Sequence, residues 1–213
     1  MSVGRLTLGA IGQGLRFVDH KDMADARMAL RSVKHASVGV YERRSGGKDW
    51  SREQLFVETD RELAVYASWG EAIAEDLRHE VAHGYLHACV PNLPLWLDEG
   101  LAEYFEVGRG RDGVNQLHVD YLRGQLAVGG WRPNLPRLEQ LIEAGELTQL
   151  DYAESWLWVH FLLHSESGRE TLLTGYLASL QPGVPAGSLA DWVKASVENP
   201  HEAVVAHLRS LDK

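Results

Sequence analysis

The sequence predicts an α+β fold, with a small, mostly antiparallel sheet in the N-terminal third and helices after it. Two observations lead to this prediction. Short segments that alternate apolar and polar residues lie within residues 1–69, whereas apolar residues three or four apart recur from residue 70 onward. With 213 residues, of which 45% are hydrophobic, the chain is long enough to build a substantial core. We therefore expect a single domain over residues 1–213.

The N-terminal part, residues 1–69, carries both strand and helix signals. An apolar run at Leu15 to Asp19 is followed by helical spacing at Asp22 to Val33. Residues Ser37 to Arg43 alternate and are rich in β-branched and aromatic side chains, and a Ser-Gly-Gly turn precedes a similar run at Gln54 to Thr59. These two runs predict a β-hairpin.

Residues 70–107 are expected to form two helices. Apolar side chains recur every fourth residue between Glu71 and Val90, and two prolines then end the helix. The second helix is expected over Leu95 to Val107. The C-terminal part, residues 108–213, shows further helical patterns, separated mostly by glycine and proline, at about 118–128, 135–144, 152–164, 169–180, 188–197 and 202–211.

Charge and cysteine content argue against several classes of function. The 21 basic and 30 acidic residues give a net charge of -9, so we expect neither nucleic acid nor an anionic membrane as a partner. Cys89 is the single cysteine, which excludes an intrachain disulfide and a cysteine-rich zinc finger, and we expect it to be buried. No segment has the pattern of a signal peptide or of a membrane span, so we expect a cytoplasmic protein.

Ten histidines are many for an acidic chain of this size, and two of them belong to a motif. The segment HEVAH, residues 79–83, lies within the first long predicted helix. Residues four apart share a helical face, so His79 and His83 can direct their imidazoles toward one metal ion, while Glu80 can reach a water on that ion. Glu99 follows sixteen residues after His83. An antiparallel return of the second helix would place it beside the histidines and complete a known catalytic zinc set.

Glu103 lies four residues after Glu99, on the same face of the second helix. From there it can accept the second N–H of a ligand histidine. Such a contact fixes the tautomer and orientation of the ring. A surface position is the alternative for this residue.

The segments HEVAH and WLDEGLAEYFE together resemble the gluzincin metallopeptidases, the group that includes thermolysin and the aminopeptidase-N-like enzymes. In that group a glutamate ligand follows H-E-x-x-H within a segment of the form W-L-x-E-G-x-A. The resemblance extends to Tyr152, at the start of the segment YAESWLWVHFL, where aminopeptidase-like members carry a transition-state tyrosine. Residues 36–165 also resemble bacterial peptidase-like domains of this clan.

The resemblance implies a zincin-like fold and a zinc-dependent peptidase that acts on a peptide or protein substrate. It implies a single zinc ion (Zn2+) held by three ligands, His79, His83 and Glu99. Glu80 would be the general base, and Tyr152 would be the oxyanion donor. The G-x-M-E-N segment that holds a free amino terminus in aminopeptidases is absent, which favours an endopeptidase. In such folds the substrate pairs with an edge strand, which we place at Ser37 to Arg43.

Other interpretations stay open on sequence alone. The ligand candidates can be incidental polar residues of a surface helix, and a chain with the metal site can be a catalytically silent zinc-binding or protein-interaction domain. Thermolysin-like enzymes use a histidine for the oxyanion, so His160 or His164 can replace Tyr152, although their helix is more simply a core element. His87 is expected near the site or at the surface. No role is expected for the remaining histidines, which are His20, His35, His118, His201 and His207.

Overall fold

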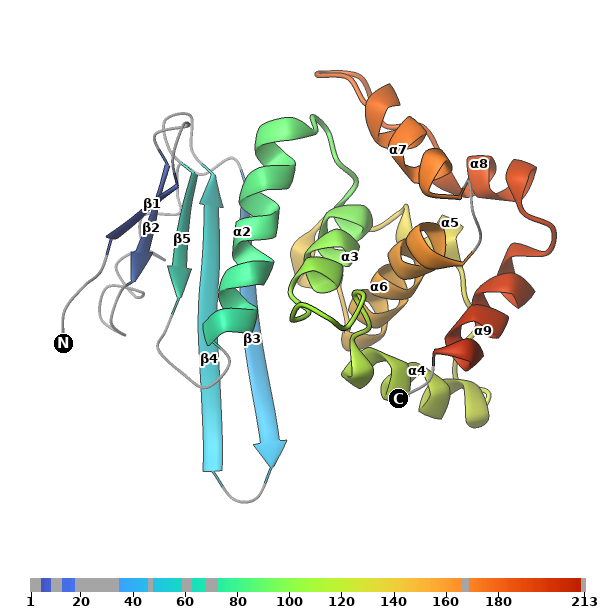
Figure 1. The fold of residues 1–213 in the computed structure, drawn as a ribbon, viewed down its shortest axis with the longest axis horizontal. Coiled ribbons are helices and arrows are strands. Elements are labelled where there is room, and N and C mark those ends of the chain that lie inside the picture. The colour runs from blue at the N-terminus through green and yellow to red at the C-terminus, as the bar shows by residue number, and fades with distance from the viewer. Residues whose placement is uncertain are drawn as a thin grey trace. The chain divides into compact units, whose positions relative to one another are not determined.

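The structure is a computed structural model of the chain (Figure 1). It describes the backbone of strands at residues 5–8, 13–17, 35–45, 48–58 and 63–67, and the helices and connections at residues 73–165 and 169–211. The chain divides into two compact units, Met1–Gly84 and Tyr85–Lys213. The boundary falls inside helix α2 (Ile73–Cys89), which is one continuous helix.

The strands lie in the first unit. They are β1 (Arg5–Leu8), β2 (Gln13–Phe17), β3 (His35–Ser45), β4 (Lys48–Glu58) and β5 (Leu63–Ala67). Their order is β1-β2-β5-β4-β3, in which the β2–β5 pair is parallel and the other pairs are antiparallel. The segment expected to bind substrate, Ser37 to Arg43, lies within β3 at one end of this order, and its role stays a prediction. The helix predicted at Asp22 to Val33 lies outside the described residues.

The second unit is built from helices. After α2 come α3 (Leu95–Phe105), α4 (Gln116–Ala127), α5 (Leu135–Leu138), the 3-10 helix η2 (Ala144–Glu146), α6 (Gln149–His164), α7 (Arg169–Ser179), α8 (Leu189–Ser196) and α9 (Pro200–Ser210). Among the described helices, none is long and apolar enough to cross a membrane. Cys89, predicted to be buried, is exposed at the end of α2.

One helix prediction fails clearly, the one over residues 135–144. Helix α5 begins there with an Asn134 cap and Pro136 in its first turn, but it ends at Leu138. Leu135 and Leu138 are buried, whereas Ile142 is 80% exposed. A short helix needs tertiary packing to persist, and residues 139–144 are at most partly buried, so they offer little packing to extend the helix.

Helix α6 is the centre of the second unit, where it contacts α3, α4, α5, α7 and α9 (Figure 1). Every residue from Ala153 to Leu162 is buried. A helix that is buried on all sides carries apolar residues around its whole circumference, which is why its pattern has little amphipathic character. This confirms that the tryptophan-rich segment around Trp156 and Trp158 is a core element.

The prediction of an α+β zincin-like fold is wrong for the core that the structure describes. Every residue of that hydrophobic core lies in a helix or in a connection between helices, and residues 73–165 and 169–211 contain no strand. The described core therefore belongs to a helical fold around α6. Strand-like and helix-like periodicity are local signals, and they do not reveal whether a helix buries its apolar face against a sheet or against other helices.

Helices α3 and α6 pack closely at Gly100. A β-carbon at this position would lie 2.7 Å from the carbonyl oxygen of Ser155. Because this oxygen belongs to the backbone, any residue larger than glycine would force the two helices apart. One turn further along α3, the Tyr104 hydroxyl lies 2.7 Å from Nε2 of His164. Burial, together with the nearby charge of Asp112, raises the pKa of Tyr104, so its hydroxyl stays protonated and can donate this hydrogen bond. Gly100 thus sets how deeply α3, including the adjacent Glu99, sits against the core.

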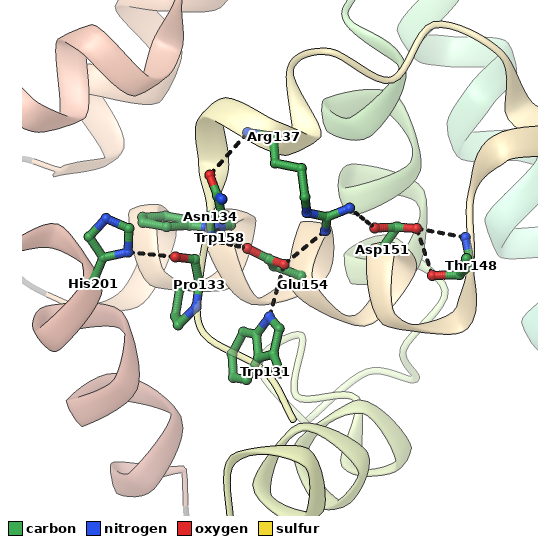
Figure 2. Close-up of polar contacts among 9 residues, drawn as sticks. All are labelled: Trp131, Pro133, Asn134, Arg137, Thr148, Asp151, Glu154, Trp158 and His201. Atoms are coloured by element: carbon green, nitrogen blue, oxygen red, sulfur yellow. Dashed lines mark hydrogen bonds and ion pairs between the residues drawn. The ribbon is translucent and has the colours of Figure 1, made fainter. Parts of the chain in front are cut away.

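A buried carboxylate joins α6 to the segment before and within α5. Figure 2 shows Glu154 between the indole N–H of Trp131, 2.9 Å away, and the guanidinium of Arg137, 3.1 Å away. The backbone N–H of Asn134 also donates to Glu154, and Arg137 pairs at 2.6 Å with Asp151. Burial alone would raise the pKa of Asp151, but hydrogen bonds from Thr148 and the Arg137 guanidinium bring it below its ordinary value. This network holds the α4–α5 connection on the central helix.

Replacing Glu154 with alanine is expected to lower the free energy of unfolding by about 3 kcal/mol. The change removes the acceptor of the buried N–H donors and the carboxylate that pairs with the charge of Arg137. The Glu154 side chain is fully buried, whereas that of Arg137 is 40% exposed and stays partly solvated. Urea unfolding of Glu154→Ala beside Glu143→Ala, a change of an exposed glutamate, measures the effect. Equal midpoints for the two variants would show that the network does not stabilise the fold.

Two buried histidines, His160 in α6 and His207 in α9, predict a pH-dependent stability. Nδ1 of His160 lies 2.9 Å from Nε2 of His207, and the rings are 2% and 9% exposed. Burial and the charge of His164 lower the pKa of His160 to about 3, and burial with His164 and Arg169 lowers that of His207 to about 4. Both pKa values lie below 6.5, the ordinary pKa of histidine, so the folded state favours the neutral form of each ring.

As pH falls below about 6.5, these two histidines become protonated in the unfolded chain but stay neutral in the folded protein. Stability is therefore complete above that pH and declines toward pH 4, by at most about 1.4 kcal/mol per pH unit for each histidine. Unfolding free energies of the wild type and of His207→Leu between pH 7 and 4.5 test this. The variant is expected to lose less stability on acidification, and parallel pH dependences would contradict the assignment.

Candidate metal centre

The ligand atoms of His79, His83 and Glu99 lie within 4.8 Å of one another. The two histidines lie one turn apart on α2, where acidic residues in the first turn and His87 in the last turn favour the helix through its dipole. Glu99 lies on α3, which begins directly after Pro94. All three side chains are buried, with exposed fractions of 4%, 0% and 2%. The structure thus brings together the three residues that the motifs singled out.

The separation of the two histidine nitrogens is compatible with a bound zinc ion. Nε2 of His79 and Nε2 of His83 are 3.1 Å apart. Two nitrogens bound to one tetrahedral zinc at about 2.0–2.1 Å are separated by roughly 3.3 Å. The same distance also suits an N–H···N hydrogen bond, and the neighbouring carboxylate of Glu99 is what favours a metal set. Two imidazoles and one carboxylate leave a fourth coordination position for water or substrate.

Glu80 is 1% exposed and follows His79 directly in the chain. Its burial contradicts the alternative that Glu80 is a solvent-exposed residue of the helix surface. A buried carboxylate is costly unless polar groups or a cation compensate its charge, and a metal ion held by the adjacent His79 would be such a cation. The role of Glu80 as general base stays a prediction.

Tyr152 lies in the first turn of α6 and is partly buried. It shares a helical face with Ser155 and Val159, the two residues that meet Gly100 of α3. This face is the one that packs on the helix of Glu99. Its role as oxyanion donor stays a prediction.

The rival oxyanion donors are engaged elsewhere. His160 contacts His207, and His164 contacts the Tyr104 hydroxyl. Neither belongs to a group of potential ligands among the described residues. The α6 histidines therefore serve the interface between helices.

A second buried cluster adjoins His79. One ligand atom each of His79, Glu103 and Glu106 lies within 4.8 Å of the others, and both carboxylates are buried. Oε2 of Glu103 accepts a hydrogen bond from Nε2 of His118 at 2.7 Å. The amide nitrogen of Asn115 donates to Oε1 of Glu106 at 2.9 Å and lies 3.5 Å from Oε2 of Glu103. Glu103 is thus next to a candidate ligand histidine, and it is a buried residue rather than a surface one.

On the other side of the site, His87 forms a 2.8 Å contact with Asp98, and the two form a further potential ligand group with His83. His87 is partly buried, and its partner Asp98 is 2% exposed. The prediction that His87 lies near the site agrees with this position. Its pairing with a carboxylate makes it a competitor of His79 for a place in the metal set.

Sequence reasoning missed His118, Asn115, Asp98 and Glu106. It assigned no role to His118 because this histidine belongs to a third helix, with no fixed spacing from the motif. A signal was present in Asn115, since asparagine is a strong helix cap and its side chain does accept from the backbone N–H of His118. A cap at that position places the first turn of α4, but not what it faces.

No family model, curated protein or solved structure matches this chain. The gluzincin resemblance therefore rests on the motifs quoted above.

Proposed function

We propose that this protein is a zinc-dependent peptidase with His79, His83 and Glu99 as ligands of one zinc ion. The observation that carries the proposal is the buried convergence of these three side chains with Glu80 beside them. The peptide or protein substrate, and the cytoplasm as the place of action, are carried over from the sequence predictions. The absence of an amino-terminus-binding segment favours internal cleavage.

In this proposal, bound zinc supplies Lewis-acid chemistry, which lowers the pKa of a water toward about 7 and polarises the scissile carbonyl. Glu80 accepts the proton of the attacking water at its carboxylate and then delivers it to the leaving amine. Tyr152 donates a hydrogen bond from its hydroxyl to the oxyanion, a contribution of about 3 kcal/mol for a typical donor of this kind.

A second candidate function is a zinc-binding or protein-interaction domain without turnover. The helical nature of the described core favours it, because the motifs then occur on a framework other than the zincin-like one that they imply. This candidate shares the metal site and differs in the predicted role of Glu80.

The test is a measurement of both properties on the purified protein. Mass spectrometry is expected to find about one zinc per chain, in line with a single three-residue ligand set that keeps an open position. A library of unblocked and end-blocked peptides is expected to be cleaved, and a chelator is expected to stop the cleavage. Zinc without cleavage of any peptide would favour the second candidate, and a metal-free, inactive protein would overturn both.

A further inference from the structure

The first turn of α4 faces two buried carboxylates, one in α3 and one directly after it. Asn115 caps α4, and the helix runs for 12 residues to Ala127. The Asn115 side chain donates to Glu106, the residue that caps the C-terminus of α3, and the His118 side chain donates to Glu103 within α3. The positive end of a helix dipole also favours negative charge at this place. Three features of one helical turn therefore compensate two buried acidic groups.

These carboxylates adjoin the candidate ligand His79, since one oxygen of each lies within 4.8 Å of a ring nitrogen of His79. Nε2 of His79 is directed toward His83, at 3.1 Å. When Nε2 serves as the metal ligand, Nδ1 is the atom left to donate a hydrogen bond. A carboxylate that accepts from this second nitrogen fixes the tautomer and holds the ring in position.

We propose that His118 and Asn115 are positioning residues of the metal centre, which act on His79 by holding the Glu103 carboxylate in place. The inference rests on the proposed metal site, but not on hydrolysis. The 2.7 Å bond from His118 and the amide of Asn115, 3.5 Å from the same carboxylate oxygen, restrict the rotation of Glu103 from the α4 side. Losing either contact would leave His79 less well oriented toward the ion.

The experiment measures zinc affinity by competition with a chromogenic chelator, together with the visible spectrum of the cobalt-substituted protein. His118→Leu and Glu103→Gln are expected to weaken zinc binding by about 10–100-fold, the range typical of outer-shell partners. His118→Gln is expected to restore most of the affinity, because its amide N–H can replace the imidazole N–H. In the first two variants the cobalt bands should change in intensity, which a general loss of stability would not cause.

Two further variants keep the test decisive. Asn115→Ser retains a helix cap but removes the amide donor, so it should fold and still bind zinc more weakly. His164→Gln is the matched control, since His164 also hydrogen-bonds a residue of α3, the Tyr104 hydroxyl, at 2.7 Å. It is expected to bind zinc like the wild type. Thermal unfolding of the metal-free forms shows which variants are folded.

The outcomes separate this inference from the proposed function. Wild-type zinc affinity in His118→Leu, Glu103→Gln and Asn115→Ser would overturn the inference and leave the peptidase proposal intact. A wild-type protein that binds zinc but cleaves no peptide would refute the peptidase proposal, while the affinity ratios would still decide the role of α4. A wild-type protein that binds no zinc would overturn both.

Discussion

Peptide hydrolysis by the Glu80→Gln variant is expected to fall by about 10²–10⁴-fold, the usual contribution of a general base. Glutamine keeps the size of the side chain but cannot accept the proton of the attacking water. The three ligands are unchanged, so zinc content should equal that of the wild type. Initial cleavage rates on one peptide at saturating zinc, with metal analysis of the same samples, measure both properties.

Glu75→Gln is the matched control for this change. Glu75 lies five residues earlier in the same helix and is exposed, so its replacement should leave both rate and zinc content unchanged. A Glu80→Gln variant that cleaves at the wild-type rate would contradict the assignment of Glu80 as the general base. Loss of zinc in that variant would instead mean that Glu80 supports the metal set.

The second large effect is expected from His83→Ala, which should leave the purified protein with little or no zinc. The imidazole of His83 is fully buried, and it belongs to two of the three potential ligand groups among the described residues. Changes of residues that only contact a ligand weaken metal binding by about 10–100-fold, and removing a direct ligand should weaken zinc binding by more than that. Zinc affinity by chelator competition gives the ratio, and cleavage should fall in parallel.

Two neighbouring variants decide which group of residues holds the ion. The set proposed here needs His79 and Glu99, whereas a second group needs His87 and Asp98, with His83 in both. A third group joins His79 to Glu103 and Glu106 without His83, so the His83→Ala variant separates it from the other two. His79→Ala is therefore expected to lose zinc and His87→Ala to retain it. The opposite result would move the metal site one turn along α2, toward Asp98, and would remove Glu80 from its place beside a ligand.

Local features of this protein were predictable from the chain, because they depend on residues close together in sequence. His79 and His83 share a helical face as a consequence of the 3.6-residue turn. Most helices of the second unit begin and end within a few residues of the predicted positions, since prolines, caps and apolar spacing mark them. The α5 helix is the exception, because its length depends on packing and not on a local signal.

The fold class and the surroundings of the site depended on contacts between residues that are far apart in the chain. The described core is helical because α6 buries its whole circumference against other helices, and periodicity does not name the partner of an apolar face. Glu103 was a candidate from its spacing to Glu99, but its partners His118 and Asn115 come from α4.

The ten histidines illustrate the same division. The motif identified the pair on α2 from a spacing of four residues. His118 and His207, which had no assigned role, prove to be held by Glu103 and by His160 across 15 and 47 residues of chain. A spacing of four residues is set by the geometry of one helix, whereas such distant contacts arise only when several helices pack against one another.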